Sequence, residues 1–97
     1  MVETIIRNGE GTIIDVRTRE EFQRGHAAGS VNIPVNELAL RIEEVKSLKS
    51  PLVLCCASGG RSSMGSHLLK QHDITCHDAG SWNNVNYLQT QTVSILL

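Results

Sequence analysis

A cysteine, two glycines and an arginine follow one another within six residues near the middle of the chain. The run is Cys56-Ala57-Ser58-Gly59-Gly60-Arg61-Ser62, and an apolar stretch ending in Cys55 precedes it. A strand that ends in a cysteine, followed by a loop and a helix, would place the thiol at a helix N-terminus. Backbone N–H groups and the helix dipole favour negative charge there, so this thiol should ionise more easily than a free one. The run therefore predicts a nucleophilic Cys56 in an anion-binding loop.

The residues after Cys56 have types suited to holding an anion. The guanidinium of Arg61 is a planar fork that pairs with sulfonate, phosphate or carboxylate groups. Gly59 and Gly60 permit the positive φ angles that a loop wrapped around a sulfur atom requires. Ser62 could donate a hydrogen bond to the sulfur or the anion, or serve only at the start of the helix. The candidate substrate-binding residues are Ala57, Ser58, Gly59, Gly60, Arg61 and Ser62.

The two other cysteines have simpler interpretations. Cys55 adjoins Cys56 on a strand, so its side chain should point to the opposite face and into the core. Cys76 is also expected in the core, in the middle of a later strand. A zinc site built from the cysteines and histidines would lack CxxC or HxxxH spacing, so we expect no metal and no cofactor. The alternative for Cys56, a structural cysteine beside a Gly-Gly turn, is disfavoured by the strand–loop–helix context.

Composition limits the class of protein. The 97 residues suit a single domain spanning 1–97, and 40% hydrophobic with 20% charged residues is typical of globular proteins. A net charge of −1 offers no broad surface for nucleic acid or membrane. The sequence contains no transmembrane run and no signal peptide, and three cysteines cannot all pair. We therefore expect a cytoplasmic monomer with no nucleic-acid or membrane partner.

Strand-like and helix-like segments alternate along the chain. Strands are predicted at 12–16, 30–33, 52–55 and 74–77, the third being the most hydrophobic and the central one. One helix should end at Asn8-Gly9, a second should carry a capping box made by Thr18 and Glu21, and a third should span about 36–48. A fourth helix follows the loop, and about 83–90 could form a fifth. Residues 79–81 are predicted to turn, and 91–97 has no clear period.

This alternation predicts an α/β fold with a mostly parallel sheet between helical layers. Sites in such sheets form at the carboxyl ends of the strands, and Asp15, Arg17 and Cys56 fall there. Gly65, inside the helix after the loop, could let that helix pack closely on the sheet.

Six motifs over about 10–82 resemble the rhodanese family, in the right order. They are Asp15-Val16-Arg17, Glu21-Phe22, Gly25-His26, Gly29-Ser30, Asn32-Ile33-Pro34 and the run from Cys56 to Ser62. The resemblance implies a three-layer fold and a sulfurtransferase that works through a persulfide on Cys56. A donor such as thiosulfate would leave its outer sulfur on Cys56. Cyanide or a thiol, such as glutathione or a thioredoxin-like protein, would remove it.

The resemblance also implies roles for the residues around the nucleophile. Arg61 would hold the sulfonate of the donor or shape the loop. Asp15, Arg17 and His26 would brace the site, and the first two could anchor the loop through charge-assisted hydrogen bonds.

Three alternatives to a thiosulfate sulfurtransferase remain open. The chain could be a persulfide carrier for a partner protein, or an interaction module of the same fold. A cysteine phosphatase or arsenate reductase also places a cysteine before an arginine, but related phosphatases use five intervening residues where this loop has four. Loop length therefore favours sulfur chemistry.

Overall fold

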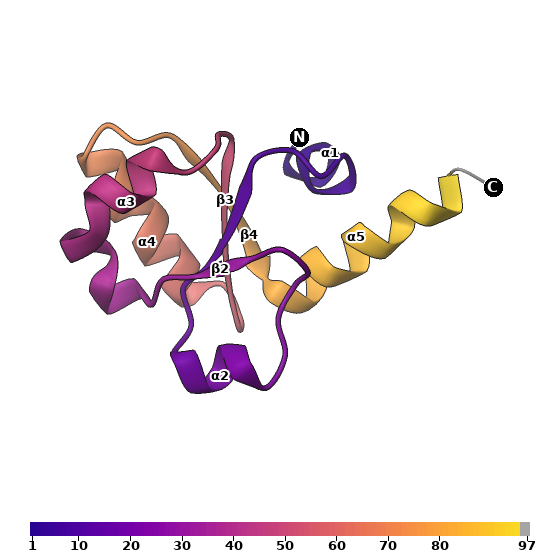
Figure 1. Cartoon of the computed structure of the whole chain (residues 1–97), viewed down its shortest axis with the longest axis horizontal. Helices are drawn as coiled ribbons and strands as arrows, with labels where there is room; N and C mark the ends of the chain where they lie inside the picture. The colour runs from indigo at the N-terminus through magenta and orange to yellow at the C-terminus, as the bar shows by residue number, and fades with distance from the viewer. Residues whose placement is uncertain (96–97) are drawn as a thin grey trace.

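Four short strands form one sheet in which all neighbours run parallel (Figure 1). The computed structural model describes residues 1–95 of the chain. The strands are β1 (Thr12–Asp15), β2 (Val31–Asn32), β3 (Leu52–Cys56) and β4 (Cys76–Ser81), in the order β2-β1-β3-β4. β3 is an inner strand and all five of its residues are buried, as its hydrophobic sequence predicts.

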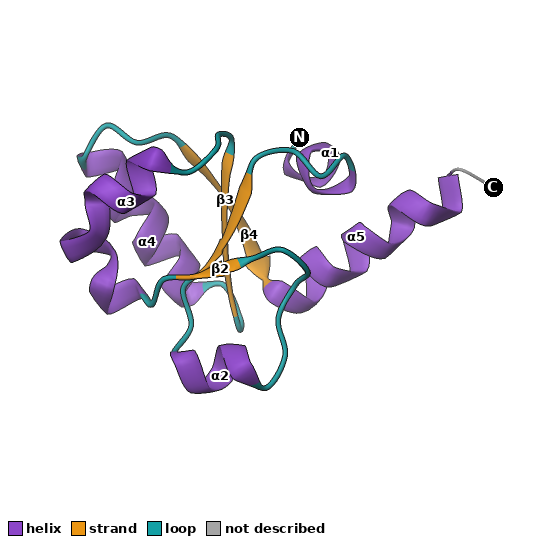
Figure 2. Cartoon of the chain, viewed as in Figure 1, coloured by secondary structure: helices purple, strands orange, loops and turns teal. Residues whose placement is uncertain are grey.

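Helices cover both faces of the sheet, which gives the predicted three-layer arrangement (Figure 2). α1 (Val2–Arg7) and α5 (Trp82–Ile95) pack on one face. The 3₁₀ helix η1 (Val35–Arg41), α3 (Ile42–Ser47) and α4 (Gly60–Gln71) pack on the other. The short helix α2 (Arg19–Gln23) lies beyond the end of the sheet. No helix within residues 1–95 is long and apolar enough to cross a membrane.

The sheet separates two hydrophobic cores, and successive residues of β3 alternate between them. Cys56 belongs to the core beneath α4, together with Leu54. Cys55 belongs to the core beneath α1 and α5, together with Val53. The prediction that the two cysteines point to opposite faces is therefore confirmed.

The predicted helix at 36–48 is in fact two helices. Residues 35–41 form η1 and residues 42–47 form α3. Arg41, at φ −119° and ψ 29°, leaves helical geometry between them, so the hydrogen-bond ladder is interrupted there. The expected apolar stripe still faces inward, because Leu38 and Val45 are fully buried.

The last strand lies later in the chain than predicted. β4 spans 76–81 instead of 74–77, so the predicted turn at 79–81 is wrong and Cys76 begins the strand instead of lying in its middle. A register shift opposite Leu54 and Cys55 accommodates one extra residue, which lets Gly80 pair with Cys55. α5 then continues to Ile95, beyond the expected 83–90, and residues 96–97 of the 91–97 segment lie outside the described residues.

At Gly65, α4 packs tightly against Leu54 of β3 and Leu38 of η1. A Cβ atom built there would lie 3.0 Å from Cδ1 of Leu38 and 3.0 Å from Cδ2 of Leu54. The absence of a side chain thus lets the helix behind the Cys56 loop sit against β3, as the sequence predicts.

We expect Gly65→Val to lower the free energy of unfolding by about 1–3 kcal/mol, because the added methyl groups overpack this contact. Urea unfolding followed by circular dichroism would measure the change. Ser63→Val, at an exposed position of the same helix, controls for the helix propensity of valine. Equal losses in both variants would contradict the packing explanation.

Candidate active site

The sulfur of Cys56 lies at the carboxyl end of β3, where the chain turns into α4. Three residues, 57–59, connect the strand to the first residue of the helix, Gly60. The amide of Gly59 donates to Sγ of Cys56 at 2.9 Å, and the thiol donates to Oγ of Ser62 at 3.4 Å. Only 1% of Cys56 is exposed. The loop therefore supplies a backbone N–H donor to a sulfur atom that is otherwise packed in the hydrophobic core.

Hydrogen bonding overrides burial at Cys56. Burial by itself would raise the pKa of this thiol, because it penalises the charged form. The hydroxyl of Ser62 and the amides of Ser62, Gly59 and Ser58 favour the thiolate, and the net effect lowers the pKa of Cys56. At Cys55, burial followed by the charge of Asp15 raises the pKa to about 12. Of these two adjacent cysteines, Cys56 is the one prepared to act as a nucleophile.

The two loop glycines have different roles. Gly59 has φ +104° and caps α4, as the wrapped loop requires. Gly60 does not have a positive φ and begins the helix, so the prediction that both glycines adopt this geometry is wrong for Gly60. In the described part of the chain, the amide of Gly59 is the loop amide that makes a hydrogen bond to the sulfur, and the amides of Ser58 and Ser62 also act to lower the pKa of the thiol.

Asp78 is a residue of the site that the sequence analysis did not find. Oγ of Ser62 donates a hydrogen bond to Oδ1 of Asp78 at 2.7 Å. Oδ1 of Asp78 also accepts a hydrogen bond from the amide of Gly80 at 2.9 Å. While Cys56 is a thiol, the Ser62 hydroxyl donates its hydrogen bond to Asp78, and a lone pair of the hydroxyl oxygen accepts the S–H group. Asp78 thus links β4 to the catalytic loop through Ser62, which a predicted strand ending at 77 could not reveal.

Arg61 extends from the first turn of α4 to a carboxylate of α2. Its Nη1 and Nη2 atoms donate to Oε1 and Oε2 of Glu21 at 2.6 and 3.0 Å. The guanidinium fork is therefore engaged by a carboxylate of the chain itself. The role of Arg61 in binding a donor stays a prediction. A donor that binds this guanidinium would have to displace the carboxylate of Glu21.

Asp15 and Arg17 form a buried ion pair beside the site. Nη2 of Arg17 lies 2.8 Å from Oδ2 of Asp15 and donates to the carbonyl of Gly25 at 2.7 Å. The guanidinium also stacks over the ring of Trp82, 4.8 Å from its centroid. Among the described residues the pair makes no hydrogen bond to the Cys56 loop, so the expectation that it anchors the loop directly is wrong. The reason is that Nε and Nη2 of Arg17 donate to Asp15, and Nη2 also donates to the carbonyl of Gly25.

His26 supports the same segment from its outer side. Its ring stacks on that of Phe22 with centroids 3.7 Å apart, and Nδ1 lies 2.7 Å from the carbonyl of Phe22. These contacts brace the end of α2, and the supporting role of His26 at the site stays a prediction.

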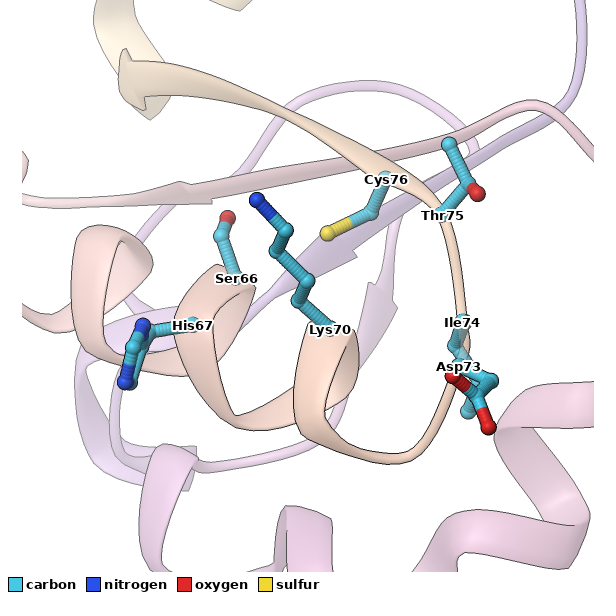
Figure 3. Close-up of a pocket in the computed structure, with 7 residues that line it drawn as sticks. All are labelled: Ser66, His67, Lys70, Asp73, Ile74, Thr75 and Cys76. Carbon is cyan, nitrogen blue, oxygen red and sulfur yellow. The ribbon is translucent and has the colours of Figure 1, made fainter.

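Cys76 lines a separate cavity of about 520 Å³ at the opposite end of α4 from the Cys56 loop (Figure 3). Its sulfur and the ammonium group of Lys70 point into the same space. Burial raises the pKa of the Cys76 thiol, which keeps it protonated. No group of three metal-ligating side chains gathers in the part of the chain that the structure describes.

The family described as the Rhodanese-like domain matches residues 2–91. Among curated relatives, the thiosulfate sulfurtransferase PspE of Escherichia coli is 33% identical over 63 residues, covering 64% of this chain and 61% of PspE. YrkF of Bacillus subtilis, named as a proposed sulfur carrier protein, is 36% identical over 59 residues, covering 61% of this chain and 31% of YrkF. The chain therefore spans less than two thirds of either relative.

A solved structure extends the similarity to most of the chain. The human single-domain sulfurtransferase TSTD1 superposes with a TM-score of 0.68 at 26% identity. The match covers 91% of this chain and 89% of that one.

We expect Ser62→Ala to slow the alkylation of Cys56 by iodoacetamide near neutral pH by about three- to tenfold, since a hydrogen bond worth ~1 kcal/mol to the thiolate is lost. The pKa of Cys56 should rise, so the pH–rate profile should move to higher pH. Ser63→Ala, at an exposed neighbouring position, is the matched control. An unchanged profile in Ser62→Ala would show that the backbone amides alone set the reactivity.

Proposed function

The chain belongs to the rhodanese family, and we propose that it is a sulfurtransferase that carries sulfane sulfur as a persulfide on Cys56. The observation that carries this proposal is the pairing of a buried sulfur with the amide of Gly59 at 2.9 Å, at the N-terminus of α4. A thiolate held in this way is nucleophilic at neutral pH, and an anion attached to it meets the same donors.

The first half-reaction takes sulfur from a donor such as thiosulfate. The Cys56 thiolate attacks the outer sulfur, the sulfur–sulfur bond of the donor breaks, and sulfite leaves with the bonding electron pair. The product on the protein is Cys56–S–S⁻, and its negative charge sits on the terminal sulfur. We expect the amides of Ser58, Gly59 and Ser62, which favour the thiolate of Cys56, to stabilise that charge as well, as an oxyanion hole stabilises an alkoxide.

The second half-reaction returns the thiolate. Cyanide attacks the terminal sulfur, and thiocyanate leaves while the electron pair of the broken sulfur–sulfur bond returns to Cys56. A thiol such as glutathione, or a cysteine of a thioredoxin-like protein, would take the sulfur in the same way as a persulfide. Because the donor and the acceptor react one after the other with the same cysteine, the kinetics should be ping-pong.

The names of two relatives support this reaction class. PspE is named as a thiosulfate sulfurtransferase and TSTD1 as a single-domain sulfurtransferase. The similarity to YrkF favours a second candidate, in which the persulfide is handed to a partner protein instead of a small acceptor. The chemistry at Cys56 is the same in both, and the acceptor distinguishes them.

Thiosulfate treatment should add the mass of one sulfur atom to the intact protein, and cyanide should remove it. Intact-protein mass spectrometry followed by peptide mapping would locate the adduct, which we expect on Cys56. A folded, reduced protein that accepts sulfur from neither thiosulfate nor a persulfide would contradict the proposal. Turnover of an aryl phosphate by that protein would instead favour a phosphatase.

We expect Cys56→Ser to abolish sulfur loading while the fold is retained, because a serine hydroxyl is not ionised at neutral pH and cannot form the persulfide. Cys55→Ala is the matched control, since Cys55 lies in the opposite core with a pKa near 12. Loading that survives in Cys56→Ser and disappears in Cys55→Ala would move the nucleophile to Cys55. Circular dichroism would verify the fold of both variants.

A further inference from the structure

We propose that Glu21 determines which sulfur donors the Cys56 loop accepts, by occupying the guanidinium of Arg61 and disfavouring dianionic donors. The inference rests on the proposed sulfur transfer and assigns its donor class as organic persulfides of low charge, R–S–SH, in preference to thiosulfate. Glu21 is a specificity residue in this account and takes no part in bond making.

The contact between Glu21 and Arg61 has the geometry of a bound anion. Both oxygens of the carboxylate meet both terminal nitrogens of the guanidinium, at 2.6 and 3.0 Å. This two-point arrangement is the one by which arginine binds carboxylate, phosphate and other flat or tetrahedral oxyanions. The side chains of Arg61 and Glu21 are 34% and 32% exposed, so an incoming ligand can reach the pair.

Glu21 is fixed in place by a second set of bonds. Its Oε1 accepts the amide of Thr18 at 3.0 Å and lies 3.1 Å from the Thr18 hydroxyl, which donates to it, while the Glu21 amide donates to that hydroxyl. The capping box therefore holds the carboxylate at the start of α2 even when Arg61 moves away. The hydrogen bond from Arg61, followed by that from Thr18, lowers the pKa of Glu21 to about 2, so the carboxylate is charged at neutral pH.

This arrangement opposes a dianionic donor in two ways. Thiosulfate must displace Glu21 to use the guanidinium, and its charge then lies beside a carboxylate that cannot leave. A persulfide with an uncharged body has no second anionic group for the guanidinium to hold, so Glu21 does not compete with it for Arg61. In that step the Cys56 thiolate attacks the terminal sulfur of R–S–SH, the sulfur–sulfur bond breaks, RS⁻ leaves with the electron pair, and Cys56–S–SH remains.

Glu21→Gln tests this role without removing the cap. Glutamine also serves in a capping box, so the bond to the Thr18 amide can persist while the charge on Arg61 is released. We expect the second-order rate constant for sulfuration of Cys56 by thiosulfate to rise about two- to fivefold. The increase is small because an exposed ion pair such as Glu21–Arg61 contributes little free energy. The rate with the persulfide of 2-mercaptoethanol should stay unchanged. An unchanged or lower thiosulfate rate in folded Glu21→Gln would overturn the inference.

Three control variants separate charge from structure. Thr18→Ala removes the hydroxyl of the cap but keeps the carboxylate and the residue 18 amide that holds it, so the ratio of the two donor rates should stay at the wild-type value. Glu44→Gln, on α3, removes an equal charge from the ion pair of Glu44 with Arg41 and should also leave the ratio unchanged. In Glu21→Gln combined with Arg61→Ala, the gain with thiosulfate should vanish. A gain that persists without Arg61 would mean simple repulsion by Glu21 and would contradict the assignment.

The wild-type protein distinguishes failure of this inference from failure of the proposed function. If Cys56 takes sulfur from neither donor, sulfur transfer itself is wrong. If it takes sulfur from both, and Glu21→Gln leaves the donor ratio unchanged, only the role of Glu21 is wrong. Quenched reactions read by intact-protein mass spectrometry give both rates in one experiment.

Discussion

The short turn from β3 into α4 is the constraint on which the site depends. Only residues 57–59 separate the last residue of the strand from the first of the helix. A turn this tight directs amides inward to the sulfur, and it requires Gly59 at φ +104° to close. It also brings Ser62, one turn into the helix, back over the sulfur that precedes it. The position of the proposed nucleophile, its hydrogen-bond donors and the helix N-terminus are thus consequences of one local geometry.

Longer-range contacts keep that geometry in register with the rest of the sheet. Gly65 lets α4 approach Leu54 closely, so the first turn of the helix cannot swing away from β3. Asp78 reaches Ser62 from β4, and Glu21 reaches Arg61 from α2. The buried pair of Asp15 and Arg17 fixes the segment that carries α2, through the carbonyl of Gly25. The loop is held at both its serine and its arginine by carboxylates distant in sequence.

The sequence predicts those parts of the site that are local and misses those that depend on pairing between distant segments. The strand ending in a cysteine, the glycine that closes the turn and the capping box of Thr18 and Glu21 all follow from short-range rules, and the structure contains them. Asp78 could not be found, because its role depends on a register shift in β4. Glu21 and Arg61 are 40 residues apart in the sequence, so no local sequence pattern predicts that they pair. Arg41 divides the predicted third helix by its backbone geometry, which a pattern of apolar residues does not encode.

The three cysteines differ in that hydrogen bonds, more than exposure, set the direction in which each pKa moves. Cys76 is the least buried of the three, yet its pKa is raised, because burial penalises the thiolate. Cys55 and Cys56 are neighbours on one strand and both almost fully buried, yet their pKa values move in opposite directions. What differs is that Cys56 meets amides freed at a helix N-terminus, whereas Cys55 meets apolar side chains and the charge of Asp15. Reactivity is therefore a property of the position at the end of β3, and a cysteine moved by one residue along the strand would lose it.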